Sequence, residues 1–171
     1  MIRSNKSFDW HAQLAPEDLP FLQVRVDPAG WYPMETFERF GNAILTNIAN
    51  DDLQAVRMWG RFSVDEQRAR APELVAPGDP METLQRFRVL RATFFDFPAV
   101  EIVMLLDDAA DIVISYGMGA KAEEAASFQT MGFFERQLEL AGASNVTGKL
   151  VTRSWAGDAR TLLSLNWEMK R

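Results

Sequence analysis

The sequence predicts an α+β fold, in which helices pack on a mainly antiparallel sheet built from two hairpins, with a long helix between the hairpins. Two β-rich runs, at 100–106 and 112–116, flank a short acidic turn and predict the first hairpin. Residues 146–155 and 160–169 flank a glycine-containing turn and predict the second hairpin. Between the hairpins, residues 121–141 begin with an alanine-rich half and predict a long helix that can lie close to a sheet.

The last predicted strand shows which side of the sheet is buried. Leu163, Leu165, Trp167 and Met169 occur at every second position, so their side chains share one face of a strand. We expect that face to form part of the core.

The N-terminal region predicts an arm that leads into a helix. Residues 21–26 alternate and are followed by the turn signal Asp27-Pro28-Ala29-Gly30, which predicts a short strand. From Pro33 to near Asn50, apolar residues recur at helical spacing and predict an amphipathic helix.

Three more helices are expected before the first hairpin. Asp51 is a suitable N-cap for a helix at 51–59, because its carboxylate can accept free backbone N–H groups. Ser63 opens a capping-box pattern that predicts a short helix at 63–71. An Asp-Pro pair opens the fourth expected helix, at 79–95.

Composition limits the class of protein. The chain has 171 residues, of which 47% are hydrophobic, enough for one core that buries roughly 70% of the surface exposed by the unfolded chain. We therefore expect an N-terminal arm at 1–30 with a short strand, followed by a single domain at 30–171. The net charge of −6 disfavours nucleic acid as a partner, because phosphate binding needs clustered lysine and arginine.

The sequence also bears on cellular location. There is no cysteine, so neither a disulfide framework nor a thiolate metal site can form. The first residues are polar rather than the apolar run of a secretory signal, and the longest apolar run, at 102–106, is too short to span a bilayer. We expect a cytoplasmic protein without a membrane span.

No motif predicts catalysis. Residues 117–122 match the G-x-G-x-x-A form, but the next strand turns back as a hairpin instead of continuing as the parallel strand that a dinucleotide site needs. Serine and threonine occur without a nucleophile elbow or a nearby base. The single histidine, His11, lies in the arm, where we expect it at the surface. We expect neither an enzyme nor a catalytic residue.

Acidic residues do not predict a metal or cofactor site either. The cluster at 107–111 is typical of a hairpin turn, in which Asp side chains bind their own backbone, and it lacks the EF-hand pattern. Glu82 precedes Arg86 by four residues, which favours an ion pair along a helix. The glutamates on the long helix have no histidine partner for a di-iron site, so we expect a solvated face. These glutamates are Glu123, Glu124, Glu135 and Glu139.

Aromatic residues are the remaining surplus. They can fill the core, line a cavity for an apolar ligand, or form a patch for another protein. The candidates for an apolar pocket or interface are Trp59, Phe94, Phe128, Phe133, Phe134 and Trp155.

The order of elements resembles that of the 4-vinyl reductase domain superfamily, which includes ligand-sensing domains of xylene- and phenol-responsive regulators and is related in fold to TRAPP vesicle-tethering subunits. The resemblance rests on the run at 131–135 in the long helix and on Leu163-Ser164-Leu165-Asn166-Trp167 in the last strand. The chain also resembles a family of uncharacterised myxobacterial paralogues, through Tyr32-Pro33 and the run at 57–61. The resemblance implies a bacterial α+β domain that holds small hydrophobic molecules or acts in protein assembly and signalling.

One difference limits what the resemblance implies. The aromatic-sensing members bind zinc through cysteines near the last hairpin, and this chain has no cysteine. Related haem and nitric-oxide sensors need an axial histidine within a helix. We therefore expect no cofactor and no metal.

Two classes of function follow. The first is a non-catalytic protein-interaction or regulatory domain that self-associates as a homodimer or binds another protein. The second is a sensory module that binds a small apolar ligand in a cavity between helices and sheet. The sensory module predicts an apolar cavity inside the domain, whereas the interaction domain predicts an exposed apolar patch on its surface.

Overall fold

The computed structural model describes residues 8–27 and 29–169. The other residues lie outside the described part of the chain: 1–7 belong to the expected arm, Pro28 to the expected turn and 170–171 to the end of the expected domain. The expected α+β fold is confirmed: helices pack on a four-stranded antiparallel sheet with the order β1-β2-β4-β3. None of the helices in the described ranges is long and apolar enough to cross a membrane.

Both predicted hairpins form the sheet. β1 (Val100–Leu105) pairs with β2 (Ala109–Ile114), and β3 (Ala143–Thr152) pairs with β4 (Thr161–Met169). β2 and β4 pair in the middle and join the hairpins. The alternation along β4 buries Leu163, Leu165 and Trp167, as expected. Met169, at the end of the strand, is 49% exposed, so the expectation that Met169 belongs to the core was wrong.

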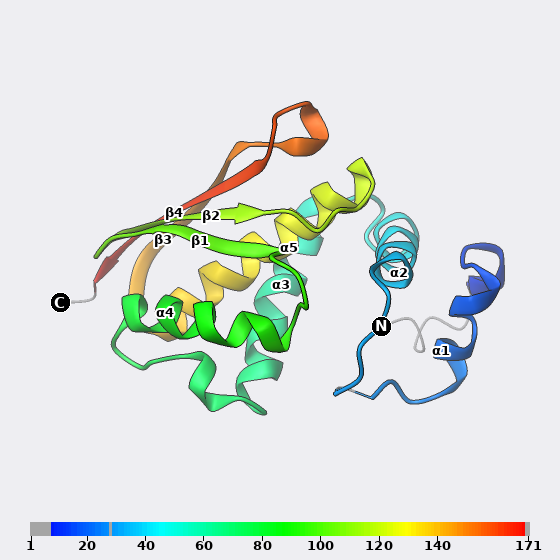
Figure 1. Ribbon diagram of the computed structural model, residues 1–171, viewed down its shortest axis with the longest axis horizontal. Coiled ribbons are helices and arrows are strands. Elements are labelled where there is room, and N and C mark those ends of the chain that lie inside the picture. Colours follow the sequence, from blue (N-terminus) through cyan, green and yellow to red (C-terminus); the bar gives the residue numbers. More distant parts are fainter. Residues whose placement is uncertain (1–7, 28, 170–171) are drawn as a thin grey trace.

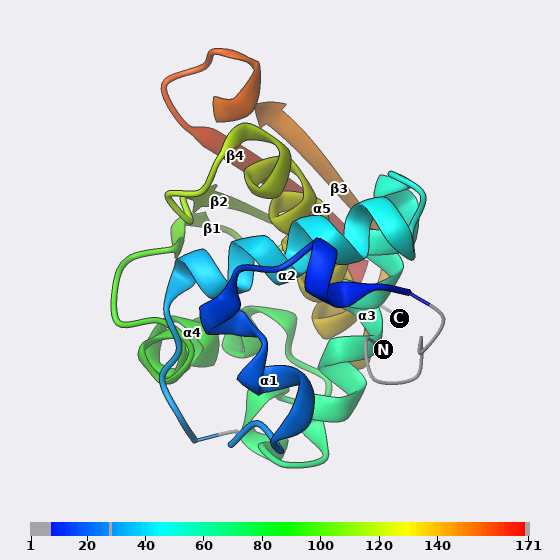
Figure 2. The same ribbon diagram turned by 90° about the vertical axis from the view of Figure 1, so that its right-hand side faces the viewer.

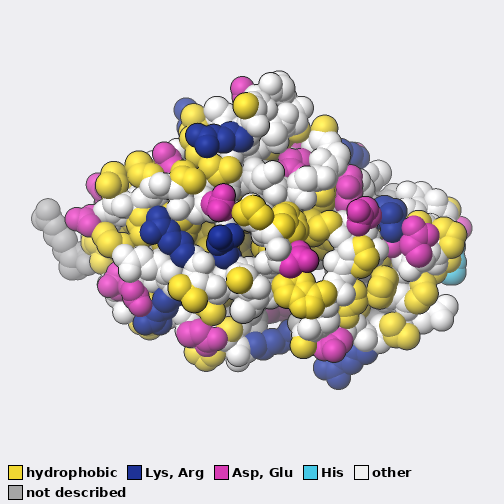
Figure 3. All heavy atoms as spheres, in the orientation of Figure 1, with side chains coloured by type: hydrophobic (Ala, Val, Ile, Leu, Met, Phe, Trp, Pro, Cys, Tyr) yellow, Lys and Arg dark blue, Asp and Glu magenta, His cyan; other side chains and the backbone are white. Residues whose placement is uncertain are grey.

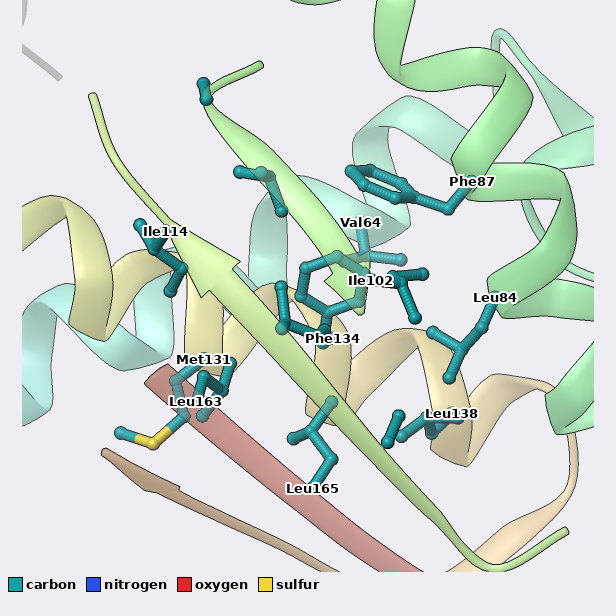
Figure 4. Close-up of a cluster of buried hydrophobic side chains, with 14 of the residues drawn as sticks. Val64, Leu84, Phe87, Ile102, Ile114, Met131, Phe134, Leu138, Leu163 and Leu165 are labelled. Atoms are coloured by element: carbon teal, nitrogen blue, oxygen red, sulfur yellow. The ribbon is translucent and has the colours of Figure 1, made fainter. Parts of the chain in front are cut away.

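Helices cover one face of this sheet (Figure 1). The long helix α5 (Ala120–Leu140) lies along β3 and β4, and α4 (Pro80–Leu90) packs against β1. Helix α3 (Leu53–Arg68) packs along α5. The main core lies between the sheet and these helices, where the rings of Phe87 and Phe134 meet edge to face at 4.7 Å (Figure 4).

Helix α3 differs from the two helices expected there. Asn50 and Asp51 take left-handed backbone conformations, so Asp52 becomes the N-cap and accepts a hydrogen bond from the Gln54 N–H at 2.8 Å. The expected capping box at Ser63 does not form, because the helix continues through it and the hydroxyl donates to the Gly60 carbonyl at 2.7 Å.

Close approach explains why α3 tolerates a glycine in its middle. A Cβ added at Gly60 would lie 1.9 Å from the Gln129 carbonyl oxygen, and one added at Gly132 would lie 1.9 Å from the Arg57 carbonyl oxygen. The two glycines thus let α3 and α5 touch backbone to backbone. Glycine costs about 1 kcal/mol in a helix interior, which this packing offsets.

A buried ion pair joins the same two helices. Glu135 is only 1% exposed, and Arg57 donates to both its oxygens, at 2.5 and 2.9 Å. The Gly148 N–H of β3 donates to the same carboxylate at 3.1 Å. Glu123 is buried too and accepts the N–H groups of Tyr116 and Met118. The expectation that these glutamates form a solvated face was therefore wrong for both.

The N-terminal arm folds onto α2 (Met34–Asn47), the helix expected from Pro33 onward. Residues 21–26, expected as a strand, instead begin within the short helix α1 (Pro20–Gln23), because proline at a first helical position favours a helix start. Trp10, Leu14 and Ala43 form a separate small core between arm and α2. His11 is exposed, as expected.

An ion pair fastens the arm to α2. Asp18 is 0% exposed, and Arg39 donates to both its oxygens, at 2.5 and 2.9 Å. These hydrogen bonds hold the pKa of the Asp18 carboxyl below its usual range. Figure 2 shows the result: α2 lies between the arm and α5.

Candidate functional site

The main cavity lies where α2 and the segment before it face α5. It has a volume of about 330 Å³, and its lining comes from residues 30–37, α3, α4, the segment at 94–95, the start of β1, Tyr116 and α5. Nine aromatic residues contribute to the lining. They are Trp31, Tyr32, Phe37, Phe87, Phe94, Phe95, Tyr116, Phe133 and Phe134.

The local sequence explains why a cavity forms at this place. Residues 30–33 belong to no helix or strand, and Trp31 among them is 62% exposed at the edge of the cavity. Beyond them, α2 sits over α5 with far fewer contacts than α3 makes with that helix. Large rings therefore wall a space that they do not fill.

A second cavity of about 240 Å³ adjoins the first. Phe37 of α2 and Ala126 and Gln129 of α5 line both, so the two cavities are neighbours that share walls beneath α2. The remaining walls of the second cavity are mostly aliphatic, including Ile44, Leu45 and Val56, and Phe40 and Trp59 add two rings. Together the two cavities follow the underside of α2.

The main cavity carries no charge. Among the described residues that line it there is no Asp, Glu, Lys, Arg or His. The second cavity has a single charged residue among its described lining, Glu38, whose carboxylate accepts the Gly119 N–H at 2.9 Å. Surface charges of both signs are interspersed on the face shown in Figure 3, without a large area of one sign.

Hydroxyl groups in the main cavity are already engaged within the protein. The Thr130 hydroxyl donates to the Ala126 carbonyl at 2.8 Å, and the Tyr116 hydroxyl lies 2.6 Å from the Thr130 oxygen. Because the Thr130 proton is used, Tyr116 is the donor of that bond. Burial raises the pKa of Tyr116 to about 12, so its hydroxyl is neutral in ordinary conditions.

Among the described residues that line the main cavity, Gln67 has a buried polar side-chain atom without a hydrogen-bond partner. The side-chain oxygen of Gln67 is buried and accepts no hydrogen bond, although Gln67 lines the main cavity. A buried acceptor without a partner is costly, since its interaction with water is lost and not replaced. A ligand that donates to this oxygen would recover that cost.

The aromatic candidates from the sequence are distributed over several places. Phe94, Phe133 and Phe134 line the main cavity, and Trp59 lines the second. Phe128 is half-buried against the main core, and Trp155 is half-buried in a short 3₁₀ turn after β3. These last two are not among the described lining residues of either cavity.

Sequence reasoning missed the polar part of the site. Gln67, Tyr116 and Thr130 have no motif around them, and they come together only through the packing of three elements. The one available signal was the aromatic density of 30–37, since Trp31, Tyr32 and Phe37 precede or begin a helix whose apolar stripe was already assigned.

Comparison with solved structures places the fold. An H-NOX protein from S. oneidensis in the Fe(II)NO ligation state is similar with a TM-score of 0.66 and 13% identity, over 93% of this chain and 88% of that one. An H-NOX protein from K. algicida gives 0.65 and 13%, over 93% and 84%. A trafficking protein particle complex subunit 3 from Naegleria fowleri, covalently bound to palmitic acid, gives 0.55 and 12%, over 80% and 97%. No protein-family model and no curated protein sequence matches the chain.

The residues of this chain do not fit a haem. The only histidine, His11, is exposed in the arm, and there is no cysteine to serve as an axial ligand. The Tyr116 hydroxyl stays protonated, because its pKa is raised to about 12, and it donates its hydrogen bond to Thr130. The described lining of the main cavity offers no cation to a haem carboxylate. A thioester to palmitic acid is equally excluded, because no thiol exists in the sequence.

Proposed function

We propose that this protein is a non-catalytic sensory module that binds a small apolar ligand in the main cavity. The observation that carries the proposal is a cavity of about 330 Å³ lined by nine aromatic residues and, among its described residues, by no charged group. Ligand sites are typically clefts of roughly 300–1,000 Å³ with mainly apolar walls and a few polar groups.

The neighbours in fold support this proposal in general terms. The H-NOX protein from S. oneidensis is in its Fe(II)NO ligation state, and the trafficking subunit is covalently bound to palmitic acid. These statements concern those proteins. Kinship with the 4-vinyl reductase-like superfamily, a bacterial origin and a signalling role stay predictions, since the similarity extends to the fold and identity is 13% or lower in these three structures.

Binding would be signalled through α2. This helix forms one wall of both cavities, and its other side carries the arm. A ligand that fills the cavities favours the position of α2 that fits it, and so shifts the population of the arm and α2 together. A partner protein that binds the exposed side of the arm would then bind more or less tightly when the ligand is present.

Native mass spectrometry of protein purified from its own host tests the proposal, because it reports retained small molecules at their stoichiometry. N-phenyl-1-naphthylamine, an uncharged fluorescent probe, serves as a second test in vitro. We expect one probe molecule per chain and at least a tenfold loss of affinity in Ala126→Leu, since Ala126 lines both cavities.

The control for that variant is Ala120→Leu, the same change at an exposed position of the same helix. It should leave probe affinity unchanged. Equal binding by Ala126→Leu and Ala120→Leu would contradict the assignment of the ligand to these cavities.

One observation supports the alternative hypothesis of a self-associating interaction domain. Met58 and Phe62 are 47% and 62% exposed and lie one turn apart on α3, so they form a small apolar area on the surface. Self-association through this area predicts a dimer in sedimentation velocity that Phe62→Glu converts to a monomer. A monomeric wild-type protein at all concentrations would leave the ligand-binding proposal as the only one of the two.

A further inference from the structure

The polar and apolar parts of the two neighbouring cavities are arranged in a definite order, which restricts what kind of molecule fits. The main cavity has the unpaired acceptor, and the second cavity has mainly apolar walls. We infer that the ligand is an uncharged amphiphile with a hydrogen-bond donor as its head group, held at Gln67, and with an aliphatic tail that runs beneath α2 into the second cavity. This inference rests on the proposed function, because it concerns the same site.

The head group is uncharged because it lies in the main cavity, where no charged side chain in the described lining neutralises a charge of either sign. An ionised carboxylate moved out of water without a cation or several donors loses far more than a neutral group does. Glu38 at the second cavity would add repulsion for an anion. A carboxylate ligand is therefore disfavoured at both ends.

The head group is a hydrogen-bond donor because the cavity wall offers it an acceptor without a partner, while the hydroxyl donors of the wall are already used. The protons of the lining hydroxyls are used internally: Ser63 donates to the Gly60 carbonyl, Thr130 to the Ala126 carbonyl, and Tyr116 to Thr130. The fourth, Tyr32, donates to the Asp27 carbonyl at 3.0 Å. Two glutamines, Gln67 and Gln129, also line the cavity, and Gln67 has a buried side-chain oxygen without a partner, an atom that can only accept.

The tail is aliphatic and elongated because the two cavities are neighbours beneath α2. Phe37, Ala126 and Gln129 are the walls that they share, and the second cavity adds the aliphatic side chains of Ile44, Leu45 and Val56. An alkyl chain gains about 0.8 kcal/mol for each CH₂ taken out of water, which is about fourfold in affinity. Chain length should therefore raise affinity until the second cavity is full.

Displacement of bound N-phenyl-1-naphthylamine provides the test, with 1-decanol, decyl methyl ether and decanoate as competitors. We expect 1-decanol to bind about fivefold more tightly than the ether, which lacks a donor, and more than tenfold more tightly than ionised decanoate. The wild-type order decanol, ether, decanoate is the expected result. Equal affinity of the ether and the alcohol, or tighter binding of decanoate, would overturn the inference.

A variant locates the head group. In Gln67→Leu we expect the ratio of alcohol affinity to ether affinity to fall from about five to about one, because only the acceptor is removed. Gln54→Leu makes the same change at an exposed position of α3 and should keep the preference. A preference that persists in Gln67→Leu would show that the head group lies elsewhere.

A second variant locates the tail. Ile44→Phe narrows the second cavity, so it should weaken 1-decanol at least tenfold and leave 1-hexanol within about twofold. Equal effects on both alcohols would contradict the tail position. If the probe itself fails to bind wild-type protein, the proposed function fails; if the probe binds but the three competitors rank otherwise, only the ligand class fails.

Discussion

Helix α5 makes two contrasting interfaces. Along α3 it packs backbone to backbone at Gly60 and Gly132, and the buried Glu135 is held by Arg57. Beneath α2 it leaves two cavities, and the arm is fastened to α2 rather than to α5. The α3 side is therefore tightly packed, and the α2 side leaves the space in which we propose the ligand site.

The largest expected effect comes from closing the approach between α3 and α5. Gly60→Ala places a methyl group where the Gln129 carbonyl oxygen lies, so the helices must separate. We expect a loss of at least about 3 kcal/mol in the free energy of unfolding, measured by chemical denaturation.

The matched control for this change lies on the α2 side. Gly41→Ala also replaces a helical glycine, but an added Cβ there meets nothing within 4 Å. Its helix propensity should stabilise the protein by up to about 1 kcal/mol. Equal destabilisation by both variants would remove the contrast between a tight and a loose interface.

The next effect concerns the buried carboxylate of the tight interface. Glu135→Gln keeps the size of the side chain but removes the charge that Arg57 and Arg61 face. We expect a loss of about 3 kcal/mol, at the lower end of the range for broken buried pairs, because Arg57 keeps 31% of its side chain exposed. A loss below about 1 kcal/mol, measured by urea denaturation, would mean that the pair contributes no more than a surface pair.

The equivalent pair in the loose region should give a smaller, acid-sensitive effect. Asp18→Asn weakens the attachment of the arm to α2 and should cost about 1–2 kcal/mol near neutral pH. Because the pKa of Asp18 is lowered in the folded protein, this contribution is complete above the ordinary carboxyl pKa and is lost as pH falls through the lower, folded value.

The difference between wild type and Asp18→Asn should therefore shrink at about pH 3. Urea denaturation followed by tryptophan fluorescence at the two pH values provides the measurement. A difference that stays constant in acid would show that the arm is held by its apolar contacts alone.

The smallest effect is that of the Tyr116 hydroxyl at the cavity wall. Tyr116→Phe removes one hydrogen bond, that to Thr130, and should cost about 1 kcal/mol. Because folding raises this pKa to about 12, the wild-type protein should also lose stability as pH rises above about 10, the usual tyrosine value. An ultraviolet titration of tyrosinate should show an ionisation near pH 12 that is absent from Tyr116→Phe; an unchanged titration would place that proton elsewhere.

The sequence predicted those parts of the fold that depend on local pattern. The hairpins, α2, α4 and α5 follow from periodicity and from the Asp79 cap, whose carboxylate accepts the Glu82 N–H at 2.8 Å. The expected pair of Glu82 and Arg86 also forms, at 2.9 Å. Each of these depends on residues close together in the chain.

The failures depend on partners far away in the sequence. Gly60 has the low helix propensity that favours a break, yet α5 needs the space that its missing side chain leaves. Glu135 has an ordinary helical position, and the arginine that buries it lies 78 residues earlier. The alternation at 21–26 indicated a strand, but no strand lies beside it within the described chain, and Leu22 packs toward α2.

The candidate site shows the same division. Aromatic content pointed to four cavity residues, Trp59, Phe94, Phe133 and Phe134, because large rings are recognisable one at a time. The acceptor at Gln67 could not be found this way, since an unpaired oxygen is a property of the packed surroundings and not of the residue type.

Hydrogen–deuterium exchange with and without bound 1-decanol tests the central claim most directly. We expect amides of α2, at 34–47, to exchange faster than those of α3 and α5 in the free protein and to slow at least tenfold on binding, while α3 and α5 change little. An α2 as protected as α5 in the free protein, or protection gained elsewhere and not in α2, would contradict a ligand site beneath that helix.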